Sequence, residues 1–64
     1  MLEDYLKTYR IKNNLTQKQM AEKLNSSQGY YSHLETGKKK PGMSMINRIA
    51  KLLNLKPSSI VKML

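Results

Sequence analysis

The sequence predicts an all-α protein, a compact domain of five short helices. Apolar residues recur along the chain at the three- and four-residue spacing of helices, and no segment shows the two-residue alternation of a strand. Residues that cap or break helices separate the periodic segments. The 64 residues leave room for one domain, residues 1–64, with a core that is only marginally stable by itself.

Two helices are expected in the first part of the chain, over residues 2–12 and 17–24. Their apolar faces are made of Leu2, Leu6 and Tyr9 in the first helix and of Met20, Ala21 and Leu24 in the second. Asn13 and Asn14 follow the first helix, and asparagine tolerates the left-handed conformation that ends helices. Thr16 is a good N-cap for the second, because its hydroxyl can accept a hydrogen bond from a free backbone N–H.

Three further helices are expected over residues 28–36, over residues 43–53 and from Pro57 onward. Ser27 is suited to cap the first of these and Gly37 to end it. Proline is favoured at the first position of a helix, which places the start of the last one at Pro57. The apolar sides of the two C-terminal helices are made of Ile46, Ile49, Ala50 and Leu53, and of Ile60, Val61 and Leu64.

The charge is strongly positive and lies mainly in the second half of the chain. Twelve Lys and Arg against four Asp and Glu give a net charge of +8. Residues 1–35 carry five basic and four acidic side chains, whereas residues 36–64 carry seven basic and no acidic ones. Such an asymmetry indicates a polyanionic partner, with nucleic acid favoured over an anionic membrane surface; the alternative is a role in solubility alone.

Composition excludes several classes of protein. Without cysteine the chain can form no disulfide and no thiolate metal site, which permits a reducing intracellular compartment. No segment approaches the ~20 apolar residues of a membrane span, and the acidic start Met1-Leu2-Glu3-Asp4 is unlike a signal peptide. A cytoplasmic protein is therefore expected. Four scattered acids and one histidine form no catalytic pair or metal site, so neither an enzyme nor a cofactor is expected.

The two short helices over residues 17–24 and 28–36 are joined by a tight turn. Such a pair can offer its second helix to the major groove of DNA. In and around this pair, a series of positions forms a recognisable pattern: Leu15-Thr16-Gln17, Met20-Ala21, Leu24, Ser32, Glu35, Gly37, Pro41 and Ile49-Ala50. In order and spacing these residues resemble the helix-turn-helix domain of the phage repressor and Cro family, the XRE-like domains. The resemblance covers nearly the whole chain without gaps, and it implies a lambda repressor-like fold and binding to double-stranded DNA.

The resemblance makes the helix over residues 28–36 the recognition helix. It implies base contacts by the outward residues Gln28, Gly29, Ser32 and His33. The chemistry agrees, because glutamine can bond bidentately to adenine, and serine or histidine can reach several groove-edge groups. The alternative for Gln28 and His33 is an ordinary solvated side chain. Glycine within a helix costs about 1 kcal/mol relative to alanine, so Gly29 is either tolerated or allows close approach to the groove.

Phosphate contacts, which fix a protein on the duplex, are expected from residues beside the recognition helix. The candidates are Gln17, Ser27, Tyr30, Lys38, Lys39 and Lys40. The resemblance also implies a partly buried structural ion pair between Arg10 and Glu35. Tyr31 stands where the family usually has a smaller aliphatic residue, and it is expected to face the core, where its hydroxyl needs a partner. Tyr30 is then expected to point outward.

A homodimer is expected, since two copies on a two-fold axis read two half-sites about one helical turn apart. The candidates for the dimer surface are apolar residues left after the core is counted: Met45, Leu52, Ile60, Met63 and Leu64. The alternative is that some of them complete a small core.

Two classes of function remain open. The leading interpretation is a sequence-specific repressor that acts by occupying a palindromic operator. The other is an antitoxin-like or regulatory module that uses the same fold to bind another protein through Met45, Leu52 and Met63. An RNA-binding or membrane-surface protein is disfavoured, because Lys38–Lys40 fall in a loop beside a polar helix. The chain is expected to be either a complete Cro-like protein or the DNA-binding part of a longer regulator.

Overall fold

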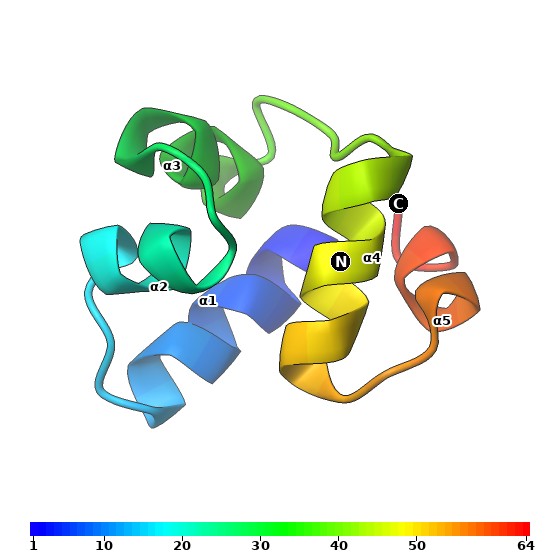
Figure 1. Cartoon of the computed structure of the whole chain (residues 1–64), viewed down its shortest axis with the longest axis horizontal. Helices are drawn as coiled ribbons and strands as arrows, with labels where there is room; N and C mark the ends of the chain where they lie inside the picture. Colours follow the sequence, from blue (N-terminus) through cyan, green and yellow to red (C-terminus); the bar gives the residue numbers. More distant parts are fainter.

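The computed structural model describes residues 1–64 and contains five helices and no strand (Figure 1). The helices are α1 (Leu2–Lys12), α2 (Gln17–Lys23), α3 (Gln28–Thr36), α4 (Met43–Leu53) and α5 (Pro57–Val61). The prediction of an all-α, five-helix domain is therefore confirmed. None of the helices is long and apolar enough to span a membrane.

Helices α2 and α3 both begin at capped residues. The Thr16 hydroxyl accepts a hydrogen bond from the Gln19 backbone N–H at 3.0 Å, and the Gln19 side chain accepts one from the Thr16 N–H at 2.9 Å. This reciprocal capping box satisfies two backbone donors that the helix itself leaves free. The Ser27 hydroxyl accepts from the Tyr30 N–H at 3.1 Å, which starts α3 at Gln28. Side chains close in sequence thus stabilise the N-termini of both helices.

Left-handed residues lie at or just beyond the ends of four helices. Asn14, Asn25 and Asn54 have φ angles of 55°, 54° and 57°, and Gly37 has a φ of 80°. Asparagine and glycine adopt this conformation with little strain, which is why the chain turns sharply at these points. A Cβ on Gly37 would also lie 2.7 Å from the Glu3 carboxylate, but that flexible side chain can move, so the requirement for glycine comes from the left-handed φ.

The end of α5 differs from the prediction. The helix stops at Val61, so Leu64 is not part of it, and only Ile60 of the expected apolar side is buried. Val61 and Leu64 are 47% and 45% exposed. A helix of five residues presents little more than one turn to the core, so only one of its side chains is covered. The boundary of α2 also moves by one residue, since Leu24 is its C-cap.

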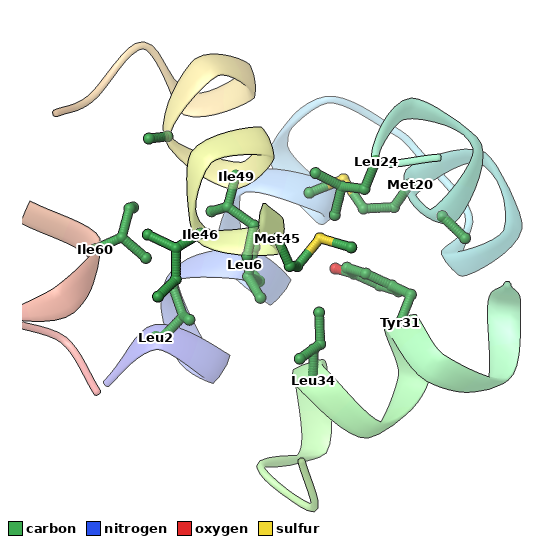
Figure 2. Packing of buried hydrophobic residues seen from close by; sticks show 12 residues of the cluster. Leu2, Leu6, Met20, Leu24, Tyr31, Leu34, Met45, Ile46, Ile49 and Ile60 are labelled. Atoms are coloured by element: carbon green, nitrogen blue, oxygen red, sulfur yellow. The ribbon is translucent and has the colours of Figure 1, made fainter. Parts of the chain in front are cut away.

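Twelve buried apolar residues form one core, to which every helix contributes (Figure 2). The members are Leu2, Leu6, Met20, Ala21, Leu24, Tyr31, Leu34, Met45, Ile46, Ile49, Ala50 and Ile60. Helix α3 packs against both α1 and α2, and α5 packs against α4. The inner face of α3 is therefore buried in the core, and its outer face is exposed to solvent.

Candidate nucleic-acid interface

Helices α2 and α3 form a helix-turn-helix pair at one edge of the domain (Figure 1). The turn between them contains the left-handed Asn25 and is closed by a 2.9 Å hydrogen bond from the Ser26 N–H to the Ala21 carbonyl. Arg48 of α4 donates to the Leu24 and Asn25 carbonyls at 3.4 and 3.3 Å. The turn is thus hydrogen-bonded both to α2 and to α4. These bonds fix the orientation of α3 relative to α2.

The predicted base-contacting residues lie together on α3, away from the core. Gln28 and Gly29 are exposed in its first turn, and Ser32 and His33 are half-buried in the following turn. The opposite side of α3 is occupied by the buried residues Tyr31, Leu34 and Glu35. A helix with this distribution presents a polar, nearly uncharged ridge to solvent, as readout of base edges in a major groove requires.

Gly29 has no structural reason to be glycine within the protein. A Cβ built on it would meet no atom within 4 Å, and its φ is not in the left-handed region. The residue therefore weakens α3 without relieving any crowding inside the domain.

We expect Gly29→Ala to raise the free energy of unfolding by about 1 kcal/mol, because alanine is the better helix former and meets open space here. Urea denaturation followed by circular dichroism measures the change. The matched control is Gly37→Ala, which is expected to lower stability because of its left-handed φ of 80°. A Gly29→Ala protein no more stable than the original would contradict the assignment of this site as unconstrained.

Gln17 lies at the start of α2, where the resemblance places a phosphate contact. The side chain is half-buried, and its Nε2 donates to Oε1 of Glu35 at 3.4 Å. An amide NH₂ group carries two hydrogens, so one remains for an anion in front of α2. Ser27 is exposed, but its hydroxyl already accepts a bond as the cap of α3.

The basic loop, residues 38–40, follows α3 directly and is exposed throughout. The Lys39 N–H donates to the His33 carbonyl at 3.2 Å, which joins the loop to the end of α3. The Lys39 ammonium also lies 5.9 Å from the centre of the Tyr30 ring, within reach of a cation–π contact. Tyr30 does not simply point outward as expected: it is half-buried and packs against the core. The loop therefore holds Lys39 close to Tyr30 of α3, and Lys39 and Lys40 both line a hollow beside Met1 and Glu3.

Arg10 of α1 and Glu35 of α3 form the ion pair implied by the resemblance. Arg10 donates from Nε and Nη2 to the two Glu35 oxygens at 2.8 and 2.9 Å, and from Nη1 to the Leu15 carbonyl at 3.0 Å. The two side chains are only 17% and 4% exposed. Such a bidentate pair fixes orientation as well as distance, so it clamps α3 and the start of α2 onto α1.

A helix-turn-helix family model matches residues 6–60 of the chain. The chain belongs to the helix-turn-helix family. It is the Cro/C1 type of helix-turn-helix, whose members are regulators that bind double-stranded DNA. The five-helix fold and the paired helices α2 and α3 agree with this assignment. Neither the curated proteins nor the solved structures compared with the chain gave a match.

The ionisation of Glu35 is shaped by the clamp in this helix-turn-helix domain. Burial of the carboxylate by itself raises the pKa, but hydrogen bonds from Arg10 and Gln17, with the Tyr31 hydroxyl nearby, hold the pKa of Glu35 below its ordinary value of 4.5. The folded protein therefore binds a proton at this site less tightly than the unfolded chain does.

This difference predicts a loss of stability in acid. The contribution of Glu35 is fully present above pH 4.5 and is lost as the pH falls through the lowered folded pKa, since protonation then favours the unfolded chain. Urea unfolding from pH 7 to pH 3 measures it. The control is Glu35→Gln, whose stability should fall less steeply over this interval even though other acids also titrate. Identical slopes for the two proteins would contradict the assignment.

Two of the residues predicted to lie in a dimer surface are buried instead, so these two predictions are wrong. Met45 and Ile60 lie in the core of the helix-turn-helix domain, because the inner faces of α4 and α5 carry these side chains into the buried cluster (Figure 2). Leu52 and Met63 are half-buried against the core, and Leu64 is exposed. The remaining candidates for the dimer surface do not form one patch. Leu52 lines a hollow beside the end of α2, whereas Met63 and Leu64 line another hollow beside Met1.

Two features of this helix-turn-helix domain escaped the sequence reasoning. The reciprocal role of Gln19 in the capping box was readable from the Thr-x-x-Gln spacing at Thr16. The bonds from Arg48 to the turn carbonyls carry no local sequence signal, because they join residues 23 and 24 positions apart.

Proposed function

We propose that the protein is a sequence-specific transcriptional repressor that binds a palindromic operator as a homodimer. The observation that carries the proposal is the outer face of α3. It presents Gln28, Gly29, Ser32 and His33 to solvent between the start of α2 and the basic loop. Repression is by occupancy of DNA in the bacterial or phage-infected cytoplasm, and no reaction is catalysed.

Sequence is read by the polar residues of α3. Gln28 pairs bidentately with an adenine, and Ser32 and His33 reach neighbouring groove-edge groups. Gly29 lies in the same first turn as Gln28 and has no side chain to hold the helix away from the bases. Its cost to the stability of α3 is then a consequence of close approach to the groove.

Phosphates are bound on either side of this ridge. Gln17 and the free N–H groups of α2 face one strand, with Ser27 beside them at the start of α3. Lys38 and Lys40 of the basic loop face the other strand. Lys39 and Tyr30, which lie against each other, are placed at the edge of this contact. These contacts set the register of α3 without specifying bases.

Dimerisation is assigned to an apolar patch of Met1, Met63 and Leu64, which line one hollow where the two ends of the chain meet. Met1 and Leu64 are among the large apolar side chains that the domain leaves exposed, and Met63 is half-buried. One domain reads only a few base pairs, so two copies related by a two-fold axis are needed for useful specificity.

The same patch supports the second candidate, a module of the antitoxin kind that binds another protein and uses DNA only secondarily. An exposed cluster of large apolar residues marks an interaction site without stating the partner. The two candidates differ in what the protein selects from random DNA.

Selection of bound molecules from random-sequence double-stranded DNA tests the proposal. A palindromic consensus with half-sites about 10 base pairs apart is expected, because each copy of α3 reads one face of the duplex. A consensus without symmetry would contradict the homodimer. No enriched sequence would contradict the repressor and favour the protein-binding module.

Lys38→Ala is expected to weaken specific and non-specific DNA binding alike and to reduce the slope of log K against log salt by about 1 per lysine, since one phosphate contact is lost. Titrations at several salt concentrations measure the slope. Lys56→Ala is the matched control: it removes the same charge from the exposed N-cap of α5, a helix that lies on the other side of α4 from α3 (Figure 1). Equal slopes for the Lys38 and Lys56 variants would remove Lys38 from the phosphate contacts.

A further inference from the structure

The outer face of α1 is an exposed surface that has no part in the proposed function. A hollow on this face is lined by Met1, Asp4, Tyr5, Thr8, Tyr9, Lys12 and Met63. Tyr5 is 43% exposed, and Ile11 of the same helix is 55% exposed. An exposed group of large apolar side chains with charged residues at its edges marks an interaction site.

The charges on this face are balanced and symmetric about Thr8. Asp4 lies four residues before Thr8 and Lys12 four residues after it, and residues four apart form one ridge along a helix. Both charged side chains are exposed, and neither forms an ion pair within the domain. The ridge therefore has one negative end and one positive end, with the small Thr8 in the middle.

A ridge of this kind is complementary to its own copy. When two α1 helices run in opposite directions and cross at Thr8, Asp4 of each copy approaches Lys12 of the other. Packing through ridges of residues four apart is the commonest way in which helices cross in globular proteins. The rest of the chain repels a second copy, since residues 13–64 carry nine basic and only two acidic side chains.

We propose that the outer face of α1 binds a second copy of this chain, with the two helices crossing at Thr8 in opposite directions. The charges specify this occupant, because each copy supplies the base that pairs with the acid of the other. The contact is centred about 10 Å along α1 from Met1, which belongs to the apolar patch assigned to dimerisation. It is therefore a second contact between copies, beyond the homodimer of the proposed function.

The outer face of α1 points away from the recognition helix. Arg10, which binds Glu35 of α3, lies two positions after Thr8 and therefore roughly 200° around the helix axis. Two copies joined through α1 thus hold their α3 helices on opposite sides of the pair. Such a pair links two separate DNA segments instead of reading both half-sites of one operator. This link to DNA rests on the proposed function, whereas the contact itself does not.

Charge exchange tests the contact, in a Leu64→Ser background that weakens association through the apolar patch. Asp4→Lys brings two lysines together at each end of the contact, and Lys12→Asp brings two acids together. Each variant alone is expected to weaken self-association about tenfold in sedimentation equilibrium at low salt. An equimolar mixture of the two variants restores both opposite-charge pairs and should recover the association of the Leu64→Ser protein.

Lys7→Asp is the matched control, because it makes the same charge change at an exposed residue of α1 that does not line the hollow. It lowers the net charge and should not weaken association. A loss caused by a less stable α1 would not recover on mixing. A Leu64→Ser protein that stays monomeric, a Lys12→Asp variant that associates as well as its parent, or a mixture no stronger than its components would each overturn the contact.

The link between DNA segments is tested with the unsubstituted Leu64. Beads that carry one operator fragment should capture a second, labelled fragment through the protein. Asp4→Lys and Lys12→Asp should each abolish this capture, while the affinity for a single operator remains unchanged. Capture that survives both substitutions would overturn the link. If the protein selects no operator, the proposed function fails, and the charge-exchange result stands separately.

Discussion

Glu35→Ala is expected to lower the free energy of unfolding by about 3–5 kcal/mol. The substitution leaves the Arg10 guanidinium, which is only 17% exposed, without the carboxylate that it binds through two hydrogen bonds. Domains have roughly 0.05–0.15 kcal/mol of stability per residue, so a chain of 64 residues has about 3–10 kcal/mol in total and would lose a large part of it. Urea denaturation followed by circular dichroism at low temperature measures the loss.

Two further variants separate the ion pair from its surroundings. Glu22→Ala removes an exposed acid from α2 and should change stability by less than about 0.5 kcal/mol. The double variant Arg10→Met with Glu35→Leu should recover most of the loss, because replacing a whole buried pair by apolar side chains is close to neutral. A double variant as unstable as Glu35→Ala would show that the loss does not come from leaving the Arg10 charge unpaired.

Gln28→Ala is expected to weaken operator binding by about 1–3 kcal/mol and to relax specificity at one position of each half-site. The exposed Gln28 lies in the first turn of α3, where it is free to pair with an adenine. Affinities for a set of operators, in which each position carries each base in turn, measure both effects.

The pattern of loss distinguishes a base reader from a general contact. Lys38→Ala serves as the comparison, since a phosphate contact is expected to weaken binding to every sequence by the same factor. An equal loss on all operator sequences after Gln28→Ala would place Gln28 among the phosphate contacts instead.

The boundaries of the helices were predictable wherever a capping side chain or a left-handed residue starts or ends the helix. Thr16 and Ser27 accept backbone hydrogen bonds at the starts of α2 and α3, and Gly37 and Asn54 turn the chain by their left-handed φ. These interactions join residues close in sequence, so short stretches of sequence contain them. The end of α5 carries no such signal, because the residue after Val61 has an ordinary right-handed conformation, and there the prediction was wrong.

The assignment of apolar residues to core or surface was less predictable. Met45 and Ile60 were expected in a dimer surface, yet both are buried within the domain. Periodicity identifies the apolar side of a helix but not what covers it, since a core and an interface bury the same kind of side chain. Tyr30 and Tyr31 illustrate the same limit: the inward position of Tyr31 followed from spacing, but the partial burial of Tyr30 beside Lys39 depends on the loop.

The sequence by itself determined the order and nearly all the boundaries of the helices, the family of the chain and the polar face of α3. Each of these depends on residue type and on spacings of a few positions. Only the tertiary structure decided how Gln17 and Tyr31 lie beside the Arg10–Glu35 pair, which side chains close the core and which apolar patch stays exposed. These features join elements up to 25 positions apart, and their geometry is set by packing of the whole domain, not by local propensity.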